Sequence, residues 1–228
     1  MKRKLLGILL LGFASGLPYM LVFSTLTAWL RDAGISLTEI GFFAWLVLTY
    51  SLKFLWAPFV DRYSIPGFVV FGKRRGWILF SQLIIFLSLI GMSFIDPLKN
   101  IQLLALFAFF AAFFGSIQDV AVDALRIEIG DAKEQGDLAA SYQLGYRVAI
   151  LVATSMALIF ADLYNWSFVY QFMGFLMLLG SAGALIVPAG KSTYVDILVQ
   201  YVIFLTATRR PHDGHVMATW PRDGERFK

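Results

Sequence analysis

The feature that most limits the fold is a long uncharged run at the start of the chain. After Lys2, Arg3 and Lys4, no Asp, Glu, Lys, Arg or His stands between Leu5 and Leu30. This run has about 26 residues, and roughly 20 are enough for a helix to cross a membrane. A signal peptide also begins with basic residues, but its apolar core is only about 7–15 residues long. The run therefore predicts a membrane-spanning helix.

The composition agrees with a membrane protein. Hydrophobic residues make up 59% of the 228 residues and charged residues only 15%, whereas soluble domains are about half apolar and a quarter charged. The chain has no Cys, which excludes a disulfide framework, a thiolate metal site and a cysteine nucleophile.

Five further apolar runs of spanning length follow, with short links between them. The sequence therefore predicts an all-α membrane protein with six transmembrane helices in a bundle over residues 1–189. The five further spans are expected at residues 40–58, 77–95, 101–124, 139–161 and 166–187.

Residues 190–228 differ in composition and are predicted to form a C-terminal tail. The apolar run at 197–207 has about 11 residues, too few to cross a membrane, so it would lie in the interface or begin a seventh span. The polar remainder is expected to be disordered. His212, His215 and Asp213 suggest a metal site, but with no Cys and no third His a solvated tail is favoured and no cofactor is expected.

Basic residues are distributed unequally between the two sets of links. The N-terminus and the links after the second and fourth spans hold nine Lys and Arg, against two, Arg31 and Lys99, in the other links. Cytoplasmic links are enriched in Lys and Arg, so both termini are predicted to be cytoplasmic. The positive net charge is thereby explained by topology, and nucleic-acid binding is not expected.

Four ionisable residues fall inside the expected spans: Lys53, Asp119, Asp123 and Arg147. Such residues are costly in a bilayer and usually face a cavity or a partner. Asp119 and Asp123 are four residues apart and lie on one helix face, and one of them is expected to pair with Arg147. The group would be either a proton or substrate relay or a static lock between helices. An aspartyl hydrolase would need its two carboxylates on separate elements, so no enzyme is expected.

The link after the second span carries a second charged pattern, Asp61-Arg62 followed by Arg74-Arg75-Gly76. Asp61 can accept charge-assisted hydrogen bonds from an arginine and so hold one conformation. This arrangement, between the second and third of six spans, resembles the gating loop of the major facilitator superfamily, although the leading glycine is absent and the spacing is longer.

The sequence more closely resembles the AmpG muropeptide permease family. The matching segments are Phe13-Ala14-Ser15-Gly16-Leu17-Pro18, Gly41-Phe42-Phe43, Lys53 to Tyr63, Arg74-Arg75-Gly76-Trp77, Gln118 to Ala124 and Gly145-Tyr146-Arg147. They extend over most of residues 1–187, whereas the tail matches nothing in that family.

The resemblance implies proton-driven import of anhydromuropeptides, which are anionic sugar-peptides, across the inner membrane of a Gram-negative cell. It makes Lys53, Asp119, Asp123 and Arg147 candidates for coupling or substrate contact. It makes Asp61, Arg62, Arg74 and Arg75 candidates for a cytoplasmic gate. Trp45 is a candidate for stacking on a sugar, with helix packing as the alternative.

Transporters of this superfamily have two six-helix halves, each built from inverted three-helix repeats, with substrate bound between the halves. The chain corresponds to one half. Three hypotheses follow: a truncated and inactive permease, a half-transporter that forms a homodimer or pairs with a separately encoded half, and a non-transporting membrane protein that binds a partner.

Overall fold

Long apolar runs favour helices in a membrane, since a helix pairs its own backbone N–H and C=O groups. The computed structural model describes residues 1–188 and contains helices and no strands within that range. Six helical segments are long and apolar enough to cross a membrane, which confirms the predicted six-helix fold. These spans 1 to 6 are Lys2–Asp32, Leu37–Leu55, Lys73–Ser93, Ile101–Ile129, Gln135–Leu163 and Trp166–Ile186.

Spans 1 and 5 each contain a π-helical segment, and the two segments face one another. The hydroxyl of Thr25 donates to the carbonyl of Ala153 at 2.5 Å, and the hydroxyl of Tyr170 donates to the carbonyl of Leu21 at 3.0 Å. The first bond joins the π-helical segments of spans 1 and 5, and the second joins the segment of span 1 to Tyr170 of span 6. Span 1 consists of α1 (Lys2–Met20), η1 (Leu21–Thr25) and α2 (Leu26–Asp32), and span 5 of α8 (Gln135–Leu151), η5 (Val152–Met156) and α9 (Ala157–Leu163).

Span 2 is broken rather than continuous. It begins with a capping box in which Ser36 and Glu39 bond to each other's backbone N–H. Because Pro58 has no N–H to donate to the carbonyl of Phe54, a continuous helix over the expected 40–58 is disfavoured. The chain instead forms α3 (Leu37–Phe42), η2 (Phe43–Leu46), α4 (Val47–Ser51), η3 (Lys53–Leu55) and α5 (Ala57–Arg62).

The other three spans are regular α-helices. The side chains of Asn100 and Asn165 cap the starts of spans 4 and 6 by accepting backbone N–H bonds. The helices are α6 (Lys73–Ser93), α7 (Ile101–Ile129) and α10 (Trp166–Ile186), with a short turn η4 (Val69–Phe71) before α6.

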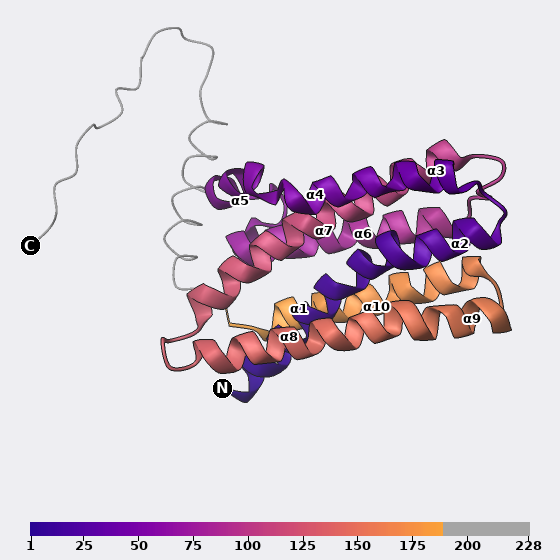
Figure 1. The fold of residues 1–228 in the computed structure, drawn as a ribbon. Helices are drawn as coiled ribbons and strands as arrows, with labels where there is room; N and C mark the ends of the chain where they lie inside the picture. The colour runs from indigo at the N-terminus through magenta and orange to yellow at the C-terminus, as the bar shows by residue number, and fades with distance from the viewer. Residues whose placement is uncertain (189–228) are drawn as a thin grey trace, which may run out of the picture.

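Helix α1 lies at the centre of the bundle and packs against α7, α8 and α10 (Figure 1). Its contact with α8 depends on glycines. A Cβ on Gly12 would overlap the carbonyl of Tyr142, and a Cβ on Gly145 would overlap the carbonyl of Leu9. Small residues allow helix backbones to approach this closely in membrane proteins.

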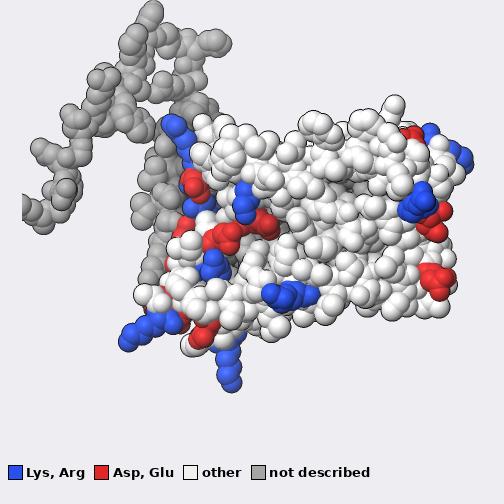
Figure 2. Space-filling model, in the orientation of Figure 1, with Lys and Arg blue, Asp and Glu red and all other residues white. Residues whose placement is uncertain are grey.

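Spans 2 and 5 are the least covered. In their most apolar stretches, 11% and 22% of residues are buried, against 44–67% in the other four spans. Figure 2 shows charged side chains mainly at the two ends of the bundle, with a largely uncharged surface between them on the face drawn. Spans 2 and 5 therefore expose apolar side chains to lipid or to another protein surface.

Several expected boundaries change; span 3, expected to begin at residue 77, begins at Lys73. Span 4 continues to Ile129 and span 5 begins at Gln135, since Arg126, Glu128 and Asp137 are tolerated near helix ends. Asp119 and Arg147 therefore lie farther from the helix ends than the sequence predicts. The predicted tail at 190–228, with His212, His215 and the run at 197–207, lies outside the described residues.

Candidate functional site

The candidate site centres on Asp119, in the middle part of α7. Its side chain is buried, with the residue 8% exposed, and Oδ1 has no hydrogen-bond partner among the described residues. The neighbouring Gln118 donates from Nε2 to Ser15 Oγ of α1 at 3.4 Å, and its Oε1 also lacks a partner within the described bundle. Buried polar atoms are rarely left unbonded unless they have a role or bind a missing group. Asp119 therefore has the free acceptor capacity expected of a functional carboxylate.

Tyrosines from spans 2 and 5 lie near this carboxylate. Tyr50, Tyr142 and Tyr146 all lie within electrostatic range of Asp119. The hydroxyl of Tyr50 is buried and unbonded in the described part of the chain, and a Cβ on Gly115, one turn before Asp119, would overlap it.

The rings form a connected group. Centroids of Tyr19 and Tyr50 lie 5.1 Å apart, those of Tyr19 and Tyr146 6.5 Å, and those of Tyr142 and Tyr146 6.1 Å. Spans 1, 2 and 5 thus contribute Tyr19, Tyr50, Tyr142 and Tyr146, called the tyrosine cluster below. Together with Asp119 of span 4, the tyrosine cluster provides hydroxyl groups, ring faces and one carboxylate from four spans.

The other three candidate coupling residues occupy different environments. Lys53 is exposed, and with Asp123 it acts electrostatically on Asp119. Asp123 Oδ1 lies 3.5 Å from Arg126 Nη2 on the same helix. Arg147 is exposed and forms no ion pair within the described residues. The predicted pairing of Arg147 with Asp119 or Asp123 is therefore wrong, because its side chain lies on the exposed side of α8.

The predicted pairing of Asp61 with an arginine is present at the end of the bundle where spans 2, 3 and 4 meet. Arg74 Nη1 lies 2.5 Å from Asp61 Oδ1, and Arg74 Nε lies 2.8 Å from Glu128 Oε1. The guanidinium thus links α5, α6 and α7. Glu128 was not predicted, since the sequence places it beyond the end of span 4.

Two other arginines of this link have separate surroundings. Arg62 is exposed, and its Cζ lies 6.0 Å from the centroid of the Tyr63 ring. Arg75 is partly buried next to Arg74. The structure therefore brings Asp61 and Arg74 into direct contact, while Arg62 projects from the same end.

Another ion pair joins the start of span 1 to the link before span 5. Lys4 Nζ lies 2.6 Å from Glu134 Oε2. The hydrogen bond from Lys4, with a backbone hydrogen bond at Asp131, lowers the pKa of Glu134 below its usual 4.5. The ion pair therefore joins the start of α1 to the residue that precedes α8 at neutral pH.

Trp45 does not join the tyrosine cluster. Trp45 is 69% exposed, and it lines a shallow hollow on span 2 with Ala44 and Leu48. Its predicted role in sugar stacking remains untested. Within residues 1–188, no cluster of three His, Asp or Glu residues could hold a metal ion.

The tyrosine cluster is the part of the site that sequence reasoning missed. Tyr142 and Tyr146 are four residues apart and therefore share a helix face, as do Gly115 and Asp119. A search for residue pairs that share a helix face, in the spans that carry charged residues, would have found these two pairs. Their meeting with Tyr19 and Tyr50 depends on how the helices are rotated, which no local pattern specifies.

Comparisons with known proteins match most of the six-span bundle. Residues 8–196 match the Major Facilitator Superfamily. The chain is 38% identical over 187 residues to an anhydromuropeptide permease of Escherichia coli strain K12, covering 82% of this chain and 38% of the relative. It is 36% identical over 181 residues to putative transporter AmpG 3 of Rickettsia typhi, covering 78% of this chain and 43% of that protein.

A third relative, an uncharacterized protein of Haemophilus influenzae, is 38% identical over 178 residues, covering 78% of this chain and 41% of the relative. The chain therefore spans about two fifths of the length of the relatives it matches.

Proposed function

The chain belongs to the Major Facilitator Superfamily, and we propose from this membership that it is one half of a proton-coupled importer of anhydromuropeptides. Its AmpG-like sequence and six spans support a transporter rather than an enzyme. The protein is a multi-pass membrane protein. In our proposal it lies in the inner membrane with both termini in the cytoplasm, as the excess of Lys and Arg in alternate links indicates.

The observation that carries the proposal is the buried Asp119 with an unbonded Oδ1. A carboxylate that takes up and releases a proton during transport needs low solvent access and no permanent cation. Asp119 meets both conditions, since no salt bridge holds it among residues 1–188 and Lys53 acts on it only at a distance. In our proposal Asp119 carries the proton, Lys53 and Arg147 attract the anionic substrate, and Asp123 contributes to coupling or substrate contact.

The tyrosine cluster supplies the chemistry to recognise a sugar-peptide. Ring faces cover the apolar faces of sugars, and phenol hydroxyls both donate and accept hydrogen bonds. Because Tyr50 and Asp119 both have unbonded buried atoms, a bound substrate would satisfy groups that the bundle leaves open. We place the substrate against Tyr19, Tyr50 and Tyr146 in this proposal.

Transport also requires a second bundle. Alternating access in this superfamily uses movement of two halves around a central substrate, and the described residues form one half. The uncovered faces of spans 2 and 5 support a homodimer or a separately encoded half as the partner. The same exposed faces support a second candidate function, a membrane protein that binds a partner without transporting.

The Arg74 ion pairs support the proposed gate. Asp61, Arg62, Arg74 and Arg75 lie at the end of the bundle that we place in the cytoplasm. A guanidinium shared by Asp61 and Glu128 stabilises one arrangement of α5, α6 and α7. In our proposal, opening toward the cytoplasm requires these bonds to break.

The test of the proton-carrying role is Asp119→Asn in the assembled transporter. We expect uptake driven by an inward proton gradient to fall to background, while exchange of labelled anhydromuropeptide across the membrane without a gradient continues, because Asn cannot release a proton. Asp96→Asn, which changes an exposed carboxylate paired with Lys99 at the other end, is the matched control and should retain uptake. Loss of exchange together with lower stability would identify Asp119 as a static lock instead.

A further inference from the structure

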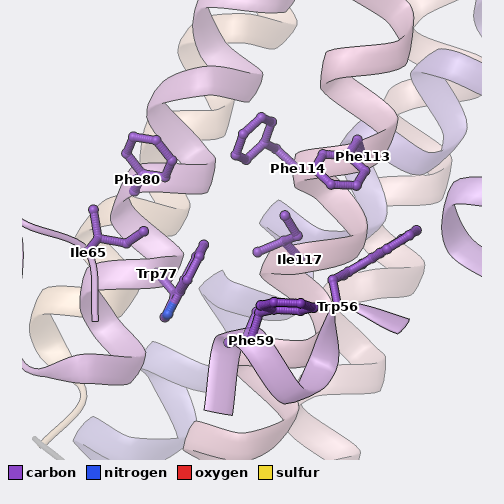
Figure 3. A pocket seen from close by; sticks show the side chains of 9 residues that line it. Trp56, Phe59, Ile65, Trp77, Phe80, Phe113, Phe114 and Ile117 are labelled. Carbon is purple, nitrogen blue, oxygen red and sulfur yellow. The ribbon is translucent and has the colours of Figure 1, made fainter. Parts of the chain in front are cut away.

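A second site lies away from Asp119, among the ends of spans 2, 3 and 4 and the link between spans 2 and 3. Figure 3 shows side chains of α5, α6 and α7 around a shared space. The cavity has a volume of about 430 Å³, within the usual range of roughly 300–1,000 Å³ for small-molecule sites. Its aromatic lining residues are Trp56, Phe59, Trp77, Phe80, Phe113 and Phe114.

The polar atoms of the lining side chains are already bonded. Trp56 Nε1 donates to Ser116 Oγ at 3.1 Å, and Trp77 Nε1 donates to the carbonyl of Tyr63 at 2.8 Å. The remaining lining side chains are Phe, Val and Ile. The cavity therefore offers ring faces and aliphatic groups, and it provides no side-chain donor or acceptor for a hydrophilic ligand.

Two cations, Arg62 and Lys73, lie close along the chain to residues that line this cavity. The Tyr63 ring stacks on Phe59, which lines the cavity, with centroids 6.3 Å apart, and Arg62 lies over that Tyr63 ring. Lys73 precedes the lining residue Trp77 by four residues on α6, so the two share a helix face. Neither Arg62 nor Lys73 forms a salt bridge within residues 1–188.

The acids Asp61 of α5 and Glu128 of α7 each contact another cation at this end. Asp61 and Glu128 both bind Arg74, so they do not neutralise Arg62 or Lys73 by direct contact. The edge of the cavity therefore has a net positive charge, while its interior is apolar. This combination fits an amphiphile that has a negatively charged head and a hydrocarbon tail.

We propose that the cavity binds an acyl chain of an anionic phospholipid whose phosphate lies between Arg62 and Lys73. The site is at the end of the spans, where headgroups meet hydrocarbon, and basic residues near a membrane surface attract anionic lipids. The bound chain would fill the space next to the ion pairs of Arg74. The lipid site is separate from the substrate site, so it does not depend on which substrate is transported.

The direct test is photolabelling in nanodiscs with phosphatidylglycerol that carries a photoreactive group in one acyl chain. Mass spectrometry should place the label on peptides that contain Phe59, Phe80 or Phe113. Unlabelled phosphatidylglycerol should compete, and unlabelled phosphatidylcholine should not.

Two kinds of variant separate the parts of the proposal. Arg62→Gln with Lys73→Gln should lower labelling at least about fivefold, since each cation near an anionic surface is worth roughly that factor. Arg31→Gln with Lys99→Gln removes two cations from the opposite end and should leave labelling unchanged. Ile65→Trp, which fills the cavity from the link, should lower labelling without changing the cations.

Three results would overturn the proposal. Label confined to other surfaces would show that the cavity does not hold an acyl chain. Equal competition by phosphatidylcholine would show that the cations do not select the headgroup. Crosslinks from a photoreactive amino acid at Phe59 to a second polypeptide, without lipid, would show that a protein helix fills the cavity.

Discussion

Substitution of Gly145 by Ala tests the packing of span 1 at the centre of the bundle. A Cβ on Gly145 would overlap the carbonyl oxygen of Leu9 and lie 2.9 Å from both the carbonyl carbon of Leu9 and the backbone nitrogen of Phe13. These are backbone atoms, so no side chain can rotate away, and α1 and α8 must separate.

The expected magnitude comes from two opposing effects. Ala is favoured over Gly in a helix by about 0.5–1 kcal/mol, whereas forcing extra atoms into a packed core costs about 1–3 kcal/mol or more. We therefore expect Gly145→Ala to lower the free energy of unfolding by about 1–2 kcal/mol.

Gly136 provides the matched control, because it lies on the same helix and a Cβ there would meet nothing within 4 Å. Gly136→Ala should leave stability unchanged or raise it. The assay is unfolding in mixed detergent micelles, followed by circular dichroism. Equal stability of the two variants would refute the close contact of α1 and α8.

Three other predictions concern single interactions. Thr25→Val should lower the free energy of unfolding by about 1 kcal/mol through loss of its buried bond to span 5, whereas Thr27→Val, at an exposed bond within its own helix, should not. Arg74→Gln should lower the free energy of unfolding by about 1–3 kcal/mol, because Asp61 and Glu128 lose their shared partner. A double variant that also removes one of these acids should lose less stability than the sum of the two single variants. Lys4 lowers the pKa of Glu134, so the ion pair stabilises the fold above pH 4.5, and this stabilisation is lost as pH falls through the lowered pKa. Glu134→Gln removes the ion pair. Thermal unfolding of wild type and variant should therefore differ at pH 7 and converge toward pH 3.

The number of spans could be predicted because an apolar run of spanning length with at most two ionisable residues has few other outcomes in a membrane protein. Pro58 was the only indication in the sequence that span 2 is broken. Counting apolar residues includes Pro58 in the run, so a continuous span over 40–58 was predicted. The π-helical segments in spans 1 and 5 left no signal, because one extra residue per turn does not change composition.

The site was predicted in part. Burial of Asp119 follows from its position in an apolar helix, and the contact of Asp61 with an arginine follows from charges on both sides of one short link. The predicted pairing of Arg147 was wrong because the direction of its side chain depends on the rotation of α8 about its axis. Gly145, two residues earlier, lies against Leu9 of α1, whereas Arg147 is exposed. The tyrosine cluster was missed for a related reason, since its members come from three spans.

The most direct test of the central claim is uptake of labelled anhydromuropeptide into proteoliposomes of known oligomeric state. The chain alone, shown by crosslinking to be monomeric, should take up no substrate under an inward proton gradient. Dimers, or the chain reconstituted with a second six-helix half, should take up substrate, and a protonophore should abolish this uptake. Protonophore-sensitive uptake by the monomer would contradict the need for a second half, and no uptake by any assembly would contradict the transport function itself.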